Sequence, residues 1–225
     1  MTDRLDGKPV ADGIDASTRA LLQSLPGTRP PHLVSVHRAA TSPFSFYLKQ
    51  QGKAAASVGI EFRAEELSSR ETASTLRERV RALDADEGVD GVLLEHPLPA
   101  ELDFFNAVSS LRPEKDVDGV SAQNLGRLVA HRPIQAPAVA LAALAVARHY
   151  RIPVEGERVT VVGRSETVGI PLALLLLARD AVRECATVTV ASPPASRASK
   201  RRASGIPTVS ERPTTVTRSP WIGIR

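Results

Sequence analysis

Apolar and polar positions along the first 120 residues predict strands and helices in alternation. Short aliphatic and β-branched runs bounded by Pro or Gly are typical of strands, and apolar residues three and four apart indicate amphipathic helices. The pattern predicts strands at 31–38, 58–62 and 89–99 and helices at 14–24, 42–57, 68–88 and 101–111. Strands that alternate with helices form βαβ units around a parallel sheet, so we expect an α/β fold.

The remaining pattern predicts a second, smaller α/β unit. A helix is expected at 136–150, a strand, glycine turn and helix at 158–180, and another strand at 186–192. Two strands are fewer than a nucleotide-binding half normally has. We therefore expect a three-layer βαβ domain at 1–121 and an incomplete Rossmann-like domain, a partial NAD(P)-binding domain, at 122–191.

Residues 192–225 have a different composition, with five Pro, six Ser and four Thr and no sustained period. Such a segment buries little apolar surface, and we expect it to be disordered. It holds seven Lys/Arg and one acid, a net charge of +6, which leaves 22 bases and 24 acids elsewhere, a net −2. The sequence pI of 9.6 thus derives from this tail, and we do not expect nucleic acid as a partner.

Two further features bear on location. No run of about 18 apolar residues is present, so no membrane helix is expected, and the polar start MTDRLDGKPVADGID does not resemble a secretory signal. The single cysteine, Cys185, cannot form an internal disulfide. These features predict a cytoplasmic protein.

The segment GRSETVGIP (163–171) joins a strand to a helix. Gly163 permits a tight turn, Gly169 permits close approach of a dinucleotide, and a helix amino end favours phosphate. Arg164 and Ser165 lie where a ribose 2′-phosphate would bind, which indicates NADP rather than NAD. A glycine turn without any ligand is an equally good interpretation of the spacing alone.

Acidic residues follow the strands in two places where ligands of parallel sheets bind. In PEKDVDG (113–119), Asp116 and Asp118 are most simply turn formers. Either could instead orient a ligand that presents two parallel N–H groups, because a carboxylate accepts both. In LLEHPLP (93–99), Glu95 could be a catalytic acid, a hydrogen-bond acceptor or a solvated residue. We expect no metal here, since no third or fourth ligand stands nearby.

The segment YLKQQGK (47–53) lies in a predicted helix. At about 100° per residue, Tyr47 and Gln51 are roughly 40° apart, whereas Lys49 and Lys53 lie about 200° and 240° from Tyr47. Whatever Tyr47 faces, Gln51 faces too, and the lysines do not. Taken alone, the pattern also fits a tyrosine at the edge of the core with solvated lysines behind it.

Together, and in this order, these four segments resemble the bifunctional methylenetetrahydrofolate dehydrogenase/cyclohydrolase (FolD) family over residues 5–192. PEKDVDG, NLGRL and GRSETVGIP match the family's motifs, and EHPLP stands for its QLPLP. The resemblance implies two α/β domains, NADP-dependent oxidation of 5,10-methylenetetrahydrofolate, hydrolysis of the methenyl product to 10-formyltetrahydrofolate, and a homodimer.

The resemblance also implies roles for single residues. Tyr47 would pack on the folate ring and Asp118 would hold the pterin edge, and with Gln51 and Glu95 they are the candidate catalytic residues. Four residues would form the cofactor site: Gly163, Arg164, Ser165 and Gly169.

This sequence departs from the family where proton transfer is expected. Gln51 replaces the family's lysine and Glu95 its loop glutamine, IQAP (134–137) replaces PCTP, and the closing glycine-rich loop is absent. An amide cannot move a proton, so we expect impaired hydrolysis unless Glu95 acts as a base. The alternatives are a truncated, inactive folate- or nucleotide-binding relative and an interaction protein that uses its basic tail.

Overall fold

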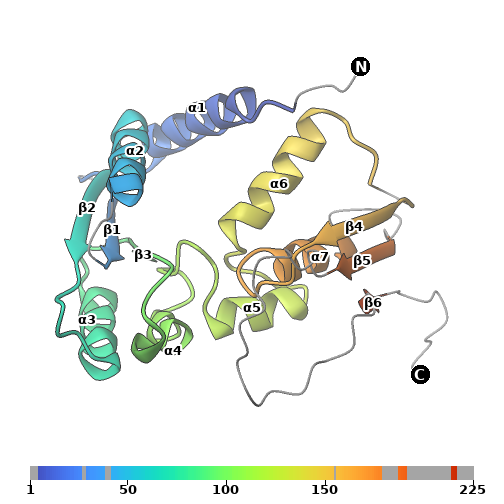
Figure 1. Cartoon of the computed structure of the whole chain (residues 1–225). Coiled ribbons are helices and arrows are strands. Elements are labelled where there is room, and N and C mark those ends of the chain that lie inside the picture. The colour runs from blue at the N-terminus through green and yellow to red at the C-terminus, as the bar shows by residue number, and fades with distance from the viewer. Residues whose placement is uncertain are drawn as a thin grey trace, which may run out of the picture. The chain divides into compact units, whose positions relative to one another are not determined.

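A computed structural model describes the chain at residues 5–26, 29–38, 42–154, 156–178, 187–191 and 214–216. Its residues fall into two units, 1–138 and 139–225. Each unit is built around a three-stranded sheet (Figure 1). The α/β class predicted from the sequence is confirmed.

The sheet of the first unit is entirely parallel and has the order β2-β1-β3. Its strands are β1 (His32–His37), β2 (Glu61–Glu66) and β3 (Gly91–Leu94). In the central strand, Val34 is opposite Arg63 of β2 and Val92 of β3. A parallel sheet places all strand ends of one kind at one edge, so the segments that follow β1 and β3 meet there.

One face of this sheet carries the apolar core. Val34 and Val36 of β1 are fully buried in one cluster with residues of helix α3 (Ala73–Ala85) and helix α4 (Phe104–Val108). The face of α3 predicted from periodicity is the one that is buried, through Leu76, Val80 and Leu83.

Helix α2 (Ser42–Val58) covers the opposite face. A Cβ atom on Gly52 would lie 3.2 Å from the Phe62 ring, so this glycine lets α2 approach β2 closely. Phe62 is opposite Leu33 in the register, and side chains two residues apart share a face. Ser35 and His37 therefore point to the α2 side. Helix α1 (Lys8–Ser24) contacts α2 and begins earlier than the predicted residue 14.

Several other predicted boundaries in this unit were wrong. The strand expected at 58–62 begins at Glu61, because α2 continues to Val58 and Gly59, at φ +91°, ends it. The strand expected at 89–99 spans only Gly91–Leu94. The helix expected at 101–111 is a 3₁₀ turn, η1 (Ala100–Leu102), followed by α4, because Asp103 at φ 48° breaks the helix and caps α4.

The boundary between the units lies at 138/139, later than the predicted boundary at residue 121. The reason is helix α5 (Ala122–Val129), which no periodicity predicted. Asn124 on α5 donates to the Pro113 carbonyl and to Asp116, both at 2.9 Å. These bonds hold α5 to the first unit.

Helix α6 (Ala138–His149) leads into the second unit, close to the predicted 136–150. Strands β4 (Arg158–Val162) and β5 (Thr187–Ala191) are parallel, and helix α7 (Gly169–Leu177) follows the glycine turn, as predicted. Within the described ranges, no helix is long and apolar enough to cross a membrane.

Within residues 192–225, for which disorder was predicted, the structure describes Thr214–Val216. These residues form strand β6, which pairs antiparallel with β5. Three consecutive β-branched residues favour a strand, and the open edge of β5 offers unpaired backbone groups. The rest of the predicted tail lies outside the described residues.

Candidate functional site

Three elements hold one carboxylate at the carboxyl end of the first sheet. Glu95 directly follows β3, and its backbone N–H donates to the Val36 carbonyl at 2.9 Å. Its Oε1 accepts hydrogen bonds from Ser35 Oγ of β1 at 3.0 Å and from Gln51 Nε2 of α2 at 2.8 Å. The Glu95 side chain is thereby fixed from the sheet below and the helix above.

The loop that carries Asp118 runs beside β3. Val92 N donates to the Lys115 carbonyl at 2.8 Å, and Val117 N donates to the Val92 carbonyl at 3.4 Å, which adds a short parallel bridge to the sheet. A Cβ on Gly91 would lie 2.5 Å from Val117 Cγ2, so the absence of a side chain at Gly91 lets the loop pack closely against β3. The bridge pairs Asp116 with Val92 of β3. If this parallel register continues, Asp118 lies beside Leu94, the last residue of β3, and Glu95 follows directly.

Asp116 is fully buried and serves the loop itself. Its carboxylate accepts from the backbone N–H groups of Gly119 at 3.0 Å and Ser121 at 2.8 Å, and from Asn124 Nδ2 at 2.9 Å. Gly119, at φ +66°, has no room for a side chain, because its Cβ would lie 2.7 Å from the Ala136 backbone. The turn-forming interpretation therefore applies to Asp116.

Asp118 is in a different situation. Within the described residues, no hydrogen bond or ion pair reaches its half-buried carboxylate. Burial, and then the negative charges of Glu95 and Asp116, raise the pKa of Asp118 to about 6. A half-buried carboxylate without a partner, with a raised pKa, is typical of a functional site.

The segment 47–53 places its side chains unequally. Gln51 is half-buried and reaches Glu95, whereas Lys49 and Lys53 are exposed. Tyr47 is 52% exposed. Another lysine, Lys115, is buried, and its Nζ donates to the carbonyls of Asp84 and Asp86, both at 2.7 Å. The Lys115 ammonium therefore caps the carbonyl groups at the C-terminal end of α3.

Two buried polar residues of β1 were not among the predicted site residues. Ser35 and His37 are 0% and 5% exposed on β1, and both point to the α2 side of the sheet. A serine and a histidine in the otherwise aliphatic run LVSVH were the available signal, since buried polar groups require partners. Ser35 finds its partner in Glu95.

In the second unit, the geometry of the turn requires its glycines. Gly163 has φ +134°, and a Cβ on Gly169 would lie 2.1 Å from the Gly163 carbonyl oxygen. Ser165 Oγ accepts from the N–H groups of Val168 at 3.2 Å and Gly169 at 3.4 Å. Arg164 is exposed and has no ion pair or hydrogen bond among the described residues. Its guanidinium is available to an anion, as a phosphate-bearing cofactor would need.

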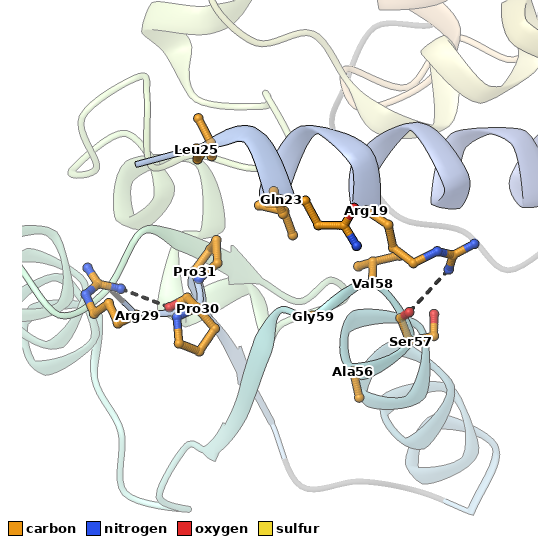
Figure 2. A pocket seen from close by; sticks show the side chains of 11 residues that line it. Arg19, Gln23, Leu25, Arg29, Pro30, Pro31, Ala56, Ser57, Val58 and Gly59 are labelled. Carbon is orange, nitrogen blue, oxygen red and sulfur yellow. Dashed lines mark hydrogen bonds between the residues drawn. The ribbon is translucent and has the colours of Figure 1, made fainter. Parts of the chain in front are cut away.

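A groove of about 610 Å³ lies at the other end of the first sheet (Figure 2). Pro31 and Gly59, which line it, stand just before β1 and β2, at the amino ends of the strands. Its arginines have partners, since Arg19 donates to the Ser57 carbonyl at 3.2 Å and Arg29 pairs with Asp90 at 2.6 Å. Ligands of parallel sheets bind at the carboxyl ends, so the Glu95–Asp118 site is the better candidate.

Two family models match this chain. Residues 5–118 match the model for the catalytic domain of tetrahydrofolate dehydrogenase/cyclohydrolase, and residues 137–204 match the model for the NAD(P)-binding domain of the same enzymes. The first match contains Gln51, Glu95 and Asp118, and the second contains the glycine turn.

Similar proteins extend over most of this chain. Bifunctional protein FolD 1 of Saccharopolyspora erythraea is 40% identical over 192 residues, 84% of this chain and 63% of that protein. Bifunctional protein FolD of Thermotoga maritima is 41% identical over 186 residues, 83% of this chain and 65% of that protein. The chain thus spans less than two thirds of the length of these relatives.

Solved structures show the same fold. A silkworm (Bombyx mori) 5,10-methylenetetrahydrofolate dehydrogenase superposes with a TM-score of 0.80 at 28% identity, covering 88% of this chain and 70% of that one. The Trypanosoma brucei dehydrogenase-cyclohydrolase, solved with NADP cofactor and an inhibitor, gives a TM-score of 0.74 at 30% identity, covering 83% of this chain and 63% of that one. With both domain models matched in order, this chain belongs to the tetrahydrofolate dehydrogenase/cyclohydrolase family.

Proposed function

We propose that this chain oxidises 5,10-methylenetetrahydrofolate to the methenyl form with NADP⁺, and that its hydrolysis of the methenyl product is impaired. The observation that carries the proposal is the hydrogen bond between Gln51 and Glu95, beside Asp118, at the carboxyl end of the first sheet. The name of the Trypanosoma brucei relative carries both activities, and the catalytic-domain match covers this site.

The folate side of the proposal uses the unpaired carboxylate. Asp118 has no hydrogen bond within the described residues, and it can accept two parallel hydrogen bonds from the amidine-like N–H groups of a pterin edge. Tyr47, 52% exposed on α2, offers an aromatic face for the ring. Asp118 would accept hydrogen bonds from the pterin edge, and the Tyr47 ring would pack against the face of the pterin.

The impairment follows from the absence of the lysine that the family uses for proton transfer. A side chain that moves protons in hydrolysis must gain and lose one near neutral pH, and the amide of Gln51 does neither. Lys49 and Lys53 are exposed and Lys115 is bound to backbone carbonyls. Among the described residues, none of these three lysines can therefore take the role of the family's lysine, whose position Gln51 occupies.

The cofactor side of the proposal rests on the second unit. Arg164 would bind the 2′-phosphate of NADP, Ser165 would shape the turn beside it, and Gly163 and Gly169 would bring the backbone close. NADP⁺ supplies the acceptor for the hydride, and the protein supplies orientation. We also propose a homodimer in the cytoplasm, on the family resemblance and on the single cysteine.

The test is to mix the purified chain with 5,10-methylenetetrahydrofolate and NADP⁺ and to follow NADPH formation. Hydrolysis of 5,10-methenyltetrahydrofolate is measured separately, as the loss of its absorbance. NADPH formation without fast hydrolysis supports the proposal. Folate binding without NADPH formation would instead support the alternative, a catalytically inactive folate-binding relative.

A further inference from the structure

Two carboxylates at the end of β3 influence each other without a neutralising cation. After burial, the negative charge of Glu95 contributes most to the raised pKa of Asp118, followed by that of Asp116, and no cation acts against them. Among the described residues, neither Glu95 nor Asp118 forms an ion pair with Lys, Arg or His. The site is therefore strongly anionic when both carboxylates are ionised.

The hydrogen-bonding groups left over at the site are mostly acceptors. Ser35 and Gln51 both donate to the same oxygen, Oε1 of Glu95. With Asp118 assigned to the pterin edge, this leaves Glu95 Oε2 and Gln51 Oε1, and Gln51 Oε1 is buried with no partner among the described residues. A carboxylate oxygen and an amide oxygen suit a ligand group that carries positive charge.

The proposed substrate acquires positive charge during the reaction. The methylene carbon lies between two nitrogens, and its C–H bond breaks with both electrons passing as hydride to the nicotinamide. The remaining bridge is an amidinium cation, whose charge is shared by both nitrogens. Hydrolysis adds water to the carbon and releases a proton, which leaves a neutral formyl group. Of the three states, only the methenyl form carries charge at the bridge.

We propose that Glu95, held by Ser35 and Gln51, selects the amidinium form of the folate one-carbon bridge over neutral forms, while Asp118 holds the pterin edge. The inference rests on the proposed function and goes beyond it, because it assigns a specificity to the residues that replace the family's lysine and glutamine. Stabilising the cation favours oxidation of the methylene form and disfavours conversion to the neutral formyl product.

The test compares two folates that differ in bridge charge. Binding of 5,10-methenyltetrahydrofolate (cationic bridge) and 5-formyltetrahydrofolate (neutral, unbridged one-carbon group) by the full chain is measured at pH 7.5 by rapid-mixing fluorescence. We expect the parent to bind the cationic ligand about tenfold more tightly or better, since a single close charge contributes at least that much in a partly buried site.

Variants separate charge from packing. Glu95→Gln keeps the shape and removes the charge, and we expect the preference for the cationic ligand to fall about tenfold while binding of the neutral ligand changes little. Gln51→Lys adds a cation beside Glu95 and should lower the preference in the same direction. Glu61→Gln, an exposed acid at the start of β2, removes one charge far from the site and should leave the preference unchanged.

The outcomes are distinct. Equal affinity of the parent for both folates, or an unchanged preference in Glu95→Gln, overturns the selectivity while leaving the proposed folate site intact. If the parent binds neither folate, the proposed function itself fails, and the selectivity fails with it.

Discussion

At the scale of single residues, Asp116 and Asp118 show how neighbouring acids in one motif take different roles. Asp116 is enclosed and accepts three hydrogen bonds, which hold the turn around it. Asp118 is half-buried and has none within the described residues. A DVDG turn does not reveal this difference, because it depends on which carboxylate the backbone folds around.

The first prediction concerns stability against pH. The pKa of Asp118 is about 6 in the folded chain, above the ordinary 3.8. Its contribution to stability is therefore fully present below about pH 3.8 and is lost as pH rises through about 6. Asp118→Asn should gain roughly 1–3 kcal/mol over the parent at pH 8 relative to pH 4.5.

Urea unfolding of both proteins at the two pH values measures this difference. Glu61→Gln, at an exposed position, serves as a control for the removal of one acidic group. A parent–variant difference that is the same at pH 4.5 and pH 8 would contradict the raised pKa.

The same residue carries a prediction about binding. Asp118→Ala should weaken folate binding by about 1–3 kcal/mol, the usual loss for a charge-assisted hydrogen bond. Fluorescence titration with tetrahydrofolate gives the affinity. Identical affinities in variant and parent would reject the role assigned to Asp118.

A third residue-scale prediction concerns Gln51→Lys. The new ammonium would lie where the amide now donates to Glu95 at 2.8 Å, and it could exchange a proton during hydrolysis. We expect methenyltetrahydrofolate hydrolysis to rise, by about 10²-fold or more if this transfer limits the rate. Gln50→Lys, at an exposed neighbouring position, is the matched control. Fast hydrolysis by the parent would show that Gln51 does not impair the reaction.

At the scale of elements, the spacing of apolar residues predicted the helices and strands whose side chains face the core. β1, α2 and the buried face of α3 follow from apolar spacing, because a buried face must be apolar. The start of β2 could not be predicted, since this edge strand is mostly exposed and polar. Nor could α5, which the contacts of Asn124 with Pro113 and Asp116 hold in place. Such elements depend on tertiary hydrogen bonds that a local pattern does not contain.

The glycine turn provides an element-scale prediction. Gly169→Ala would place a methyl group 2.1 Å from the Gly163 carbonyl oxygen, and forcing β4 and α7 apart should cost about 1–3 kcal/mol. Gly126→Ala is the control, because Gly126 is exposed within α5 and its Cβ would meet nothing within 4 Å. That change should stabilise the chain by about 0.4–1 kcal/mol. Denaturant unfolding followed by circular dichroism measures both, and a neutral Gly169→Ala would contradict the close approach.

At the scale of the whole molecule, the sequence located much of the candidate site but not how it is held. Gln51, Glu95 and Asp118 come from segments far apart in the chain, and the rule that parallel sheets bind ligands at their carboxyl ends predicts that such segments meet. The support of Ser35 beneath Glu95 was not predicted. It depends on the strand register and on which face α2 covers, and both are decided by packing.

The last prediction is that NADP binds more weakly to this chain than to the relatives that it resembles. In a doubly wound site, parallel strands continue on both sides of the crevice that holds the cofactor. Here the described sheet of the second unit has the order β4-β5-β6, and β6 runs antiparallel to β5 along one edge. The glycine turn and Arg164 are present, so binding should be retained but weakened. Fluorescence titration with NADPH of this chain and of the Thermotoga maritima relative measures the difference. Arg164→Ala should weaken NADPH more than NADH if the guanidinium binds the 2′-phosphate. Micromolar or tighter NADPH binding by this chain would contradict the prediction, because it would show that the antiparallel edge does not impair the site.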